Sequence, residues 1–243
     1  MMSFFKNIFS RKNRSVWGKA YKHLPIKSDY RAHDVAFELI KNRIGTKKTI
    51  DVLDIATGTG AFTQRITDNF PGWKIEINDY ENQALITNYK KYNVDLNSFF
   101  SSSFSSEGYD LIIALEIIEH IENPWNFIRE IKKLLRKDGV LILSTPNVDS
   151  TLDRLIYLIN GHPQYFGETG YTNSGGHITQ VPDWLLKLIV QNSGYSNIEL
   201  CSDIDTSPHI GIIAYLKLLF LMPFSRFYMR NRNNRSINIY VCN

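Results

Sequence analysis

Short apolar runs of strand length alternate with helical patterns along most of the chain, and this alternation constrains the fold more than any other feature. The apolar runs predict strands at residues 50–56, 74–78, 97–100, 109–115 and 140–144. The intervening segments predict helices at residues 30–44, 61–69, 82–91 and 124–135. Alternating strands and helices are typical of βαβ units, whose strands pair in parallel. The sequence therefore predicts an α/β fold built on a parallel sheet.

Beyond the fifth strand the pattern loosens. Helices at residues 152–159 and 182–191 flank a glycine-rich loop at 161–176, and two more strands are expected at 198–201 and 237–241. We therefore expect a doubly wound, seven-stranded, mostly parallel sheet of Rossmann-like type, with helical elaborations at both ends of the chain. Such sheets bind their ligands at the carboxyl ends of the strands. The chemistry is thus expected on the loops that follow Ile55, Ile77, Leu115 and Leu143.

The composition fits one folded domain without disulfide bonds. Of the 243 residues, 43% are hydrophobic and 21% are charged, which suits a sizeable core and argues against a disordered chain. Two cysteines, Cys201 and Cys242, are too few for a disulfide scaffold or a cysteine-only zinc site. This cysteine usage favours a reducing, cytoplasmic location.

Charge divides the chain into a basic arm (residues 1–28), a core (29–205) and a C-terminal region (206–243). In the last region an apolar, basic helical insertion is expected before the final strand of the same domain. The arm carries seven basic groups and the C-terminal region five, and neither contains an acid, whereas the core holds 16 basic and 24 acidic groups. An acidic core makes nucleic acid an improbable partner, because phosphate binding requires a basic face.

Large apolar side chains accompany the basic groups at residues 4–9 and 210–224. Anionic membrane surfaces attract this combination. The 210–224 stretch is shorter than the ~20 apolar residues that a membrane span needs, and Lys217 and Pro223 interrupt it. Two interpretations stay open: peripheral contact with the inner face of the membrane, or a flexible arm and a helix packed on the domain.

The segment VLDIATGTG, from Val52 to Gly60, is a strand with an acid near its end, followed by a glycine-rich turn that opens a helix. A dinucleotide fingerprint requires glycine or alanine where Thr63 stands, and no Gly-Lys-Ser/Thr triplet of a P-loop follows. Asp54 would repel a pyrophosphate and suits a ligand that carries a cation. Asp79 ends the second strand, where doubly wound folds place an acid on a ribose diol. A ribose and an amino-acid cation without phosphate describe S-adenosylmethionine.

Five segments together resemble the class I S-adenosylmethionine-dependent methyltransferases: DVLDIATGTG, INDYE, GYDLIIALEIIEHIENP, LLRKDGVLILSTPN and GGHITQVPDWLLKLIVQNSGY. The last segment is similar to a subgroup that includes ubiquinone-pathway O-methyltransferases and bacterial glycoconjugate-cluster methyltransferases. The resemblance runs from about residue 49 to residue 194. The chain departs from the family pattern at Ala56, where a glycine is usual. It departs again after the third strand, where serines at 101–103 stand in place of an acid.

The resemblance implies a role for each matching residue. The methionine end of the cofactor would lie against Asp54, Ala56, Gly58 and Gly60. Asp79 would hold the ribose, and Tyr80 would lie on the adenine. Leu115 and Glu116 would sit beneath the sulfonium.

Carboxylates and imidazoles gather after the fourth and fifth strands. Glu116, Glu119 and His120 follow the fourth strand, and His177 follows the fifth. Such oxygen and nitrogen ligands suit magnesium, manganese or zinc, and a bound metal would lower the pKa of an acceptor hydroxyl. The same E-x-x-E-H with a later histidine occurs in the plant small-RNA 2′-O-methyltransferases and resembles the metal cluster of some ubiquinone-pathway enzymes.

Two other interpretations of these residues stay open. His120 or His177, with Glu119 beside them, is a candidate for metal-free base catalysis, because the pKa of histidine lies near physiological pH. Alternatively, Glu119 and His120 only cap the helix that begins at Pro124, and His177 only holds its loop.

From these residues we predict an S-adenosylmethionine-dependent O-methyltransferase that acts on a hydroxyl of a saccharide or of a lipid-linked surface glycan. Rings and small polar groups suit such an acceptor, and the candidates to line its pocket are His162, Tyr165, Phe166 and Tyr171, with Trp17 and Tyr21 as a lid. Two alternatives are a quinone-pathway phenol O-methyltransferase and a catalytically silent S-adenosylmethionine-binding partner protein.

Overall fold

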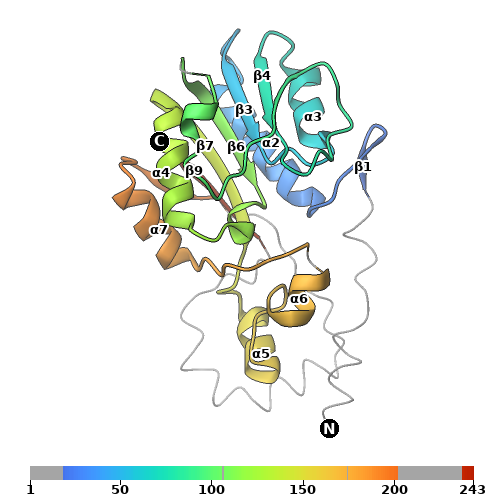
Figure 1. The fold of residues 1–243 in the computed structure, drawn as a ribbon, viewed down its shortest axis with the longest axis vertical. Helices are drawn as coiled ribbons and strands as arrows, with labels where there is room; N and C mark the ends of the chain where they lie inside the picture. The colour runs from blue at the N-terminus through green and yellow to red at the C-terminus, as the bar shows by residue number, and fades with distance from the viewer. Residues whose placement is uncertain (1–18, 106, 174, 202–236) are drawn as a thin grey trace.

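A computed structural model describes residues 19–105, 107–173, 175–201 and 237–243. Seven strands form one sheet in the order β5-β4-β3-β6-β7-β9-β8 (Figure 1). From β5 to β7 the neighbouring strands pair in parallel, and β9 runs antiparallel to both its neighbours. The predicted seven-stranded, mostly parallel sheet is confirmed. Its strands are β3 (Asp51–Ile55), β4 (Lys74–Asn78), β5 (Lys90–Tyr92), β6 (Tyr109–Leu115), β7 (Leu135–Pro146), β8 (Ile198–Leu200) and β9 (Ile237–Cys242).

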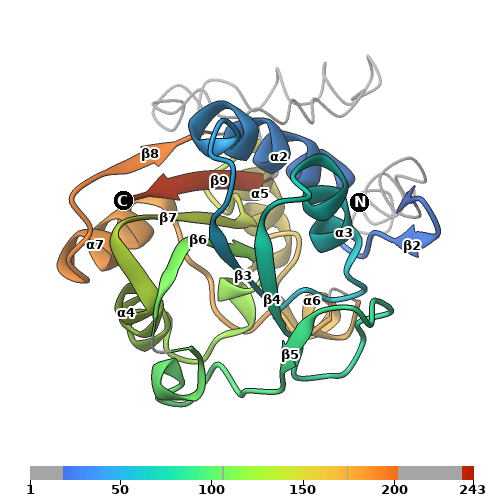
Figure 2. The ribbon, with the colours of Figure 1, turned by 90° about the horizontal axis from the view of Figure 1, so that it is seen from above.

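Helices cover both faces of the sheet. Apolar side chains of α2 (Tyr30–Ile44) and α3 (Ala61–Asn69) share one buried core with the strands. Those of α4 (Pro124–Leu134) and α7 (Asp183–Asn192) share another core with the opposite sides of the same strands. Figure 2 shows α2 and α4 on opposite sides of the sheet. This double winding leaves the carboxyl ends of β3, β4, β6 and β7 uncovered by these four helices.

Local sequence explains where these helices begin. The Asp29 side chain accepts a hydrogen bond from the Arg31 backbone N–H and caps α2. The Asn123 side chain caps α4 in the same way, with Pro124 in the first turn, where proline's missing N–H costs nothing. Ser150 caps α5 (Thr151–Asn160) by accepting from the Asp153 N–H. The short helix α6 (Gly167–Asn173) lies beside α5 below the sheet in Figure 1.

The connection between the second and third parallel strands, β4 and β5, differs from the prediction. Residues 82–91 form no helix, and the third strand lies at Lys90–Tyr92 rather than at 97–100. A parallel crossover usually needs a dozen or more residues, and a helix over 82–91 would consume the residues that pair with β4. The connection is extended instead. Two hydrogen bonds hold its backbone. Ala84 N donates to Asp79 Oδ2 (2.6 Å), and Leu85 N donates to the Thr59 carbonyl (3.1 Å).

Two smaller predictions also change. The expected loop at 161–176 contains α6, and the described part of the N-terminal elaboration is a hairpin rather than a helix. That hairpin pairs β1 (Ala20–Tyr21) with β2 (Leu24–Pro25) and is tied to α3 by an ion pair between Lys22 and Asp68 at 2.7 Å. Tyr21 lies in this hairpin, whereas Trp17, residues 4–9 and residues 210–224 lie outside the described residues. Among the described residues, no helix is long and apolar enough to cross a membrane.

Candidate active site

The glycine-rich turn links the end of β3 to the start of α3. Ala56, Gly58 and Gly60 all adopt left-handed backbone, with φ of 61°, 55° and 89°. A Cβ added at Gly58 would meet nothing within 4 Å, so the backbone there faces open space. A Cβ at Gly60 would lie 2.5 Å from Cδ1 of Ile86. The turn therefore offers bare backbone on one side and is closed by the 79–89 segment on the other.

Asp54 is buried beneath this turn rather than facing out of it. Its Oδ2 accepts hydrogen bonds from the hydroxyls of Thr57, at 2.9 Å, and Thr63. Burial raises the pKa of Asp54 to about 6, and the two hydroxyl bonds partly oppose that rise. Asp54 thus fixes the shape of the turn from within.

Asp79 and Tyr80 follow β4 at the same edge of the sheet. Asp79 is buried, and its Oδ2 lies 3.7 Å from Nζ of Lys91 in addition to its bond with Ala84 N. The carboxamide of Asn93 donates to the backbone carbonyls of Asp79 (3.2 Å) and Tyr80 (2.9 Å). The Tyr80 ring is 59% exposed. The acid is held in place while the ring beside it stays accessible to a flat ligand.

Leu115 ends β6, and Glu116 follows it in left-handed backbone with φ of 51°. The Ser144 hydroxyl accepts from Glu116 N (3.0 Å) and donates to Glu116 Oε1 (2.7 Å). Burial raises the pKa of Glu116, with the nearby Asp29 charge acting in the same direction. This reciprocal bonding fixes a carboxyl group at the centre of the site.

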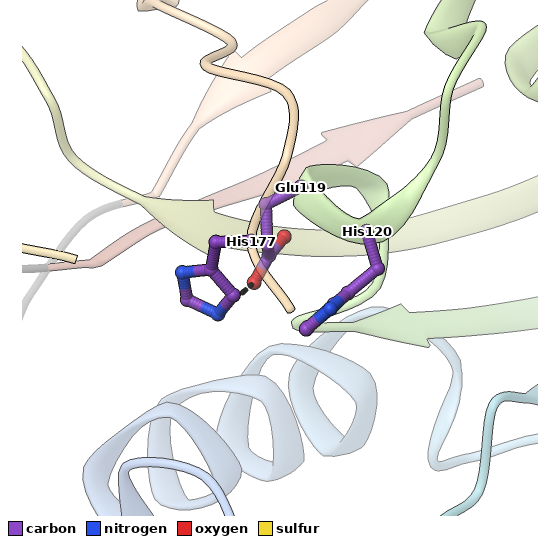
Figure 3. A group of neighbouring side chains, drawn as sticks. All are labelled: Glu119, His120 and His177. Carbon is purple, nitrogen blue, oxygen red and sulfur yellow. Dashed lines mark ion pairs between the residues drawn. The ribbon is translucent and has the colours of Figure 1, made fainter. Parts of the chain in front are cut away.

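Glu119, His120 and His177 converge from two distant parts of the chain (Figure 3). Glu119 and His120 belong to the short helix η2 (Ile118–His120), and His177 follows α6. One ligand atom from each residue lies within 4.8 Å of the other two. The two imidazole rings are 4.7 Å apart at 80°, and His177 Nε2 lies 3.9 Å from Glu119 Oε1. Glu116, expected in the same cluster, is not one of these three residues, and its Oε1 accepts a hydrogen bond from the Ser144 hydroxyl.

Backbone bonds bring the two parts together. The N–H groups of Ile178 (2.9 Å) and Thr179 (3.0 Å) both donate to the Glu119 carbonyl. The Thr179 hydroxyl donates to the Ile121 carbonyl at 2.6 Å. Gly175 and Gly176 turn the chain into this arrangement in left-handed backbone.

The cluster has the properties of a metal site. Glu119 Oε1 and His177 Nδ1 are buried without a hydrogen-bond partner among the described residues, which is costly for polar atoms. Burial raises the pKa of Glu119 well above its usual value, lowers that of His120, and lowers that of His177 to about 4. Neutral imidazoles keep a lone pair for a cation. The three residues therefore fit a divalent metal with nitrogen and oxygen ligands.

Aromatic side chains lie close to His177. The rings of Phe166 and Tyr165 lie 5.4 Å and 6.4 Å from the His177 ring. Burial raises the pKa of Tyr165 to about 12. Tyr171 is exposed on α6, and His162 is turned toward the backbone, with Nδ1 2.9 Å from the Pro163 carbonyl. Of the four predicted lining residues, the structure places Tyr165 and Phe166 against the cluster.

Two site features escaped sequence reasoning. Asp29 and Arg31 form a bidentate ion pair, with Arg31 donating to both carboxylate oxygens, and their charges act on the pKa of Tyr165. In the sequence Asp29 is recognisable only as a helix cap and Arg31 only as a residue of the first helical turn, so neither signals a place in the site. Asp95 lies three residues after β5, so an acid does follow the third strand, and residues 101–103 form instead a short helix, η1 (Ser101–Ser103). Correct placement of the third strand would have revealed Asp95.

This fold and site define the class of protein, and the comparisons with known proteins agree. A family model described as a methyltransferase domain matches residues 29–200. The chain belongs to this family. Its matched domain is that of a class I S-adenosylmethionine-dependent methyltransferase, and it resembles the ubiquinone-pathway enzymes.

Curated relatives are distant. The Ubiquinone biosynthesis O-methyltransferase of Rickettsia bellii (strain OSU 85-389) is 26% identical over 149 residues, which are 57% of this chain and 60% of that protein. Probable polyketide synthase 22 of Dictyostelium discoideum is 26% identical over 218 residues, which are 80% of this chain and 9% of the synthase. The chain thus spans less than two thirds of the length of either relative.

Solved structures share the fold. An S-adenosylmethionine-dependent methyltransferase from Archaeoglobus fulgidus superposes with a TM-score of 0.56 and 13% identity, covering 86% of this chain and 93% of its own. The plantazolicin methyltransferase BpumL, solved in complex with SAH, has a TM-score of 0.56 and 13% identity, covering 88% of this chain and 82% of its own. At these identities the likeness concerns the fold.

Proposed function

We propose that the chain methylates a hydroxyl group and activates that hydroxyl through Glu119, His120 and His177. The observation that carries this proposal is the convergence of these side chains beside Glu116 at the end of β6. Methyl transfer to oxygen requires a positioned acceptor and a route for its proton. A buried carboxyl with two neutral imidazoles supplies both functions.

We assign the cofactor contacts by position at the carboxyl ends of the strands. Ala56, Gly58 and Gly60 border the methionine end, and Asp54 holds their turn rather than touching the ligand. Asp79 holds the ribose diol, Tyr80 covers the adenine, and Leu115 and Glu116 lie beneath the sulfonium. Two residues join this set. Asp95 is a candidate to bind the adenine amino group. Arg31, which also pairs with Asp29, is a candidate to bind the carboxylate at the methionine end of the cofactor.

We assign Glu119, His120 and His177 as the metal ligands. A bound divalent cation would lower the pKa of the acceptor hydroxyl and hold a neighbouring acceptor oxygen. The orphaned buried Oε1 of Glu119, which lies 3.9 Å from Nε2 of His177, supports this assignment. Metal-free base catalysis by His120 or His177 is the competing proposal. The low pKa of His177, about 4, makes it a weak base and favours the metal.

The proposed acceptor is a hydroxyl of a saccharide, free or on a lipid-linked surface glycan. Its support is the pairing of Tyr165 and Phe166 with the polar cluster. A quinone-pathway phenol is the second candidate, and the names of several curated relatives favour it. Either acceptor agrees with peripheral contact at the inner face of the membrane, which we infer from the basic, apolar ends of the sequence.

The decisive experiment is calorimetric titration of the metal-stripped full-length chain with S-adenosylhomocysteine and, separately, with Mn²⁺. We expect micromolar binding of the nucleoside and a second heat from the metal. Asp79→Ala should weaken S-adenosylhomocysteine binding at least tenfold, through the loss of a charged hydrogen bond of about 1.5–3 kcal/mol, and leave the Mn²⁺ heat intact.

Methyl transfer to saccharide and catechol acceptors should follow Mn²⁺ addition. Nucleoside binding without a metal heat, but with turnover, would establish metal-free base catalysis instead. Nucleoside binding without turnover on any acceptor would favour the silent partner protein.

A further inference from the structure

The two carboxylate oxygens of Glu119 have different surroundings. Oε2 accepts a hydrogen bond from the Thr145 hydroxyl at 3.2 Å. Oε1 has no hydrogen-bond partner among the described residues and lies 3.9 Å from His177 Nε2. The Glu119 side chain is completely buried, so solvent does not compensate for this difference. One oxygen is thus anchored, and the other is directed at the histidines.

The backbone of Thr145 is held by the sheet. It lies near the end of β7, is 1% exposed, and stands opposite Asn238 in the register with β9. One residue earlier, Ser144 pairs with Leu115 of β6. The backbone of Thr145 is therefore fixed within the sheet, and its hydroxyl is a stationary reference point. Because the Glu119 carbonyl also accepts from Ile178 N and Thr179 N, Glu119 is fixed at both its backbone and its side chain.

We propose that Thr145 is a positioning residue that makes Glu119 a single-oxygen metal ligand. This inference rests on the metal site of the proposed function. By occupying Oε2, the Thr145 hydroxyl leaves only Oε1 directed toward the cation. Mn²⁺, Mg²⁺ and Zn²⁺ accept such a ligand, whereas Ca²⁺ takes six to eight oxygens and often binds a carboxylate through both. Thr145 therefore favours the smaller cations over Ca²⁺.

The test compares Thr145→Val with Thr145→Ser in the metal-stripped full-length chain. Valine keeps the shape and removes the hydroxyl, whereas serine keeps the hydroxyl. Calorimetry measures the Kd for Mn²⁺ and for Ca²⁺ with each variant. We expect Thr145→Val to weaken Mn²⁺ binding roughly 10- to 100-fold, as is typical for loss of an outer-sphere partner. The Ca²⁺ affinity should fall less or rise, and Thr145→Ser should stay within about threefold of the parent chain.

A matched control uses another threonine of similar bonding. Thr67 on α3 donates to the Thr63 carbonyl at 3.1 Å and contacts the Tyr89 hydroxyl at 2.8 Å, away from the cluster. Thr67→Val should leave both metal affinities unchanged. S-adenosylhomocysteine binding and thermal unfolding of every variant report whether the fold is intact.

The outcomes separate this inference from the proposed function. If the parent chain binds Mn²⁺ and Thr145→Val binds it equally well, the role of Thr145 is wrong and the metal site stands. An equal loss of Mn²⁺, Ca²⁺ and S-adenosylhomocysteine affinity would show a merely structural role. Failure of the parent chain to bind Mn²⁺ while it binds S-adenosylhomocysteine would overturn the metal site and the role of Thr145 with it.

Discussion

Ala56 and Glu116 adopt left-handed backbone at the carboxyl ends of two neighbouring strands, β3 and β6. Non-glycine residues avoid this region, at a cost of order 1–3 kcal/mol when they are held there. Both residues border the proposed cofactor site. Ser144 holds Glu116 in place, and the Thr57 N–H, which donates to the Asn78 carbonyl at 3.0 Å, holds the turn after Ala56. The strain is therefore borne where the backbone must turn sharply around a ligand.

At Gly60, left-handed backbone coincides with close packing against Ile86. We expect Gly60→Ala to destabilise the fold by about 1–2 kcal/mol from left-handed backbone alone, and further because its Cβ would meet Ile86. S-adenosylhomocysteine affinity should fall with it, since Ile86 must move. Denaturant unfolding and calorimetry measure the two effects.

Gly161→Ala is the control for that prediction. Gly161 has a similar φ of 79°, but a Cβ there meets nothing within 4 Å. We expect Gly161→Ala to lower the free energy of unfolding only by the roughly 1–2 kcal/mol of left-handed backbone strain, and to keep full cofactor affinity. Equal affinities for the two variants would contradict the packing role of Gly60.

At the scale of the element, two helix caps can be compared. The cap of α5 is bonded to the loop that contains Tyr165, whereas the cap of α4 is not. Ser150 caps α5 and also bonds Asp153, whose Oδ1 accepts from Gln164 N at 2.8 Å next to Tyr165. Asn123 caps α4 on the other side of the sheet. We expect Ser150→Ala and Asn123→Ala each to cost about 1 kcal/mol of stability. Ser150→Ala alone should also raise the KM for the acceptor, while S-adenosylhomocysteine affinity stays constant.

Steady-state kinetics and unfolding of the two variants check this expectation. A KM that rises equally in both variants would mean that lost stability, rather than displacement of the 162–166 loop, alters acceptor binding.

Elements whose signals are local could be predicted from the sequence. The helices at 30–44 and 61–69 and the strands at 74–78 and 109–115 agree with the structure to the residue, because each combines a regular apolar pattern with a clear cap or turn. The 82–91 helix fails because pairing of Lys90–Tyr92 with β4 is a long-range contact that local pattern does not record. The same limit hides Asp29 and Arg31, which reach the site only through packing of α2.

The candidate site shows the same difference between features with a local sequence signal and features that depend on long-range contacts. Asp79, His120 and His177 could be chosen because acids and imidazoles follow strands that end at one edge of the sheet. The separation of Glu116 from Glu119 could not, since it depends on which hydroxyl each carboxylate meets, Ser144 or Thr145. Glu116 itself has left-handed backbone, and the directions of the side chains at and after it are set by tertiary structure.

At the scale of the whole molecule, stability should depend on pH through buried histidine. His33 is buried against Phe62 and bonds the Ser28 hydroxyl at 3.0 Å. Burial lowers its pKa from 6.5 to about 4. The unfolded chain therefore takes up a proton that the folded chain refuses. The stabilisation from His33 is complete above pH 6.5 and is lost as the pH falls toward 4.

We expect His33→Gln to flatten the fall in unfolding free energy between pH 6.5 and 4 by up to about 3 kcal/mol. His23, which is exposed in the hairpin, provides the control, because His23→Gln should leave the pH dependence unchanged. Urea unfolding at a series of pH values gives the comparison. Parallel curves for the parent chain and His33→Gln would show that folding does not lower the pKa of His33.

The junction at the Glu119 carbonyl, where Ile178 N and Thr179 N both donate, has a consequence for how such enzymes diversify. Apart from Arg31, the residues proposed for the cofactor lie between 54 and 116, and the aromatic residues proposed to line the acceptor pocket, Tyr165 and Phe166, follow Ser150. Backbone bonds of this kind tolerate any residue except proline at the two donor positions. The segment after the fifth strand is therefore open to exchange between relatives that keep His177, and such an exchange would bring a new acceptor preference while the residues proposed for the cofactor remain unaltered.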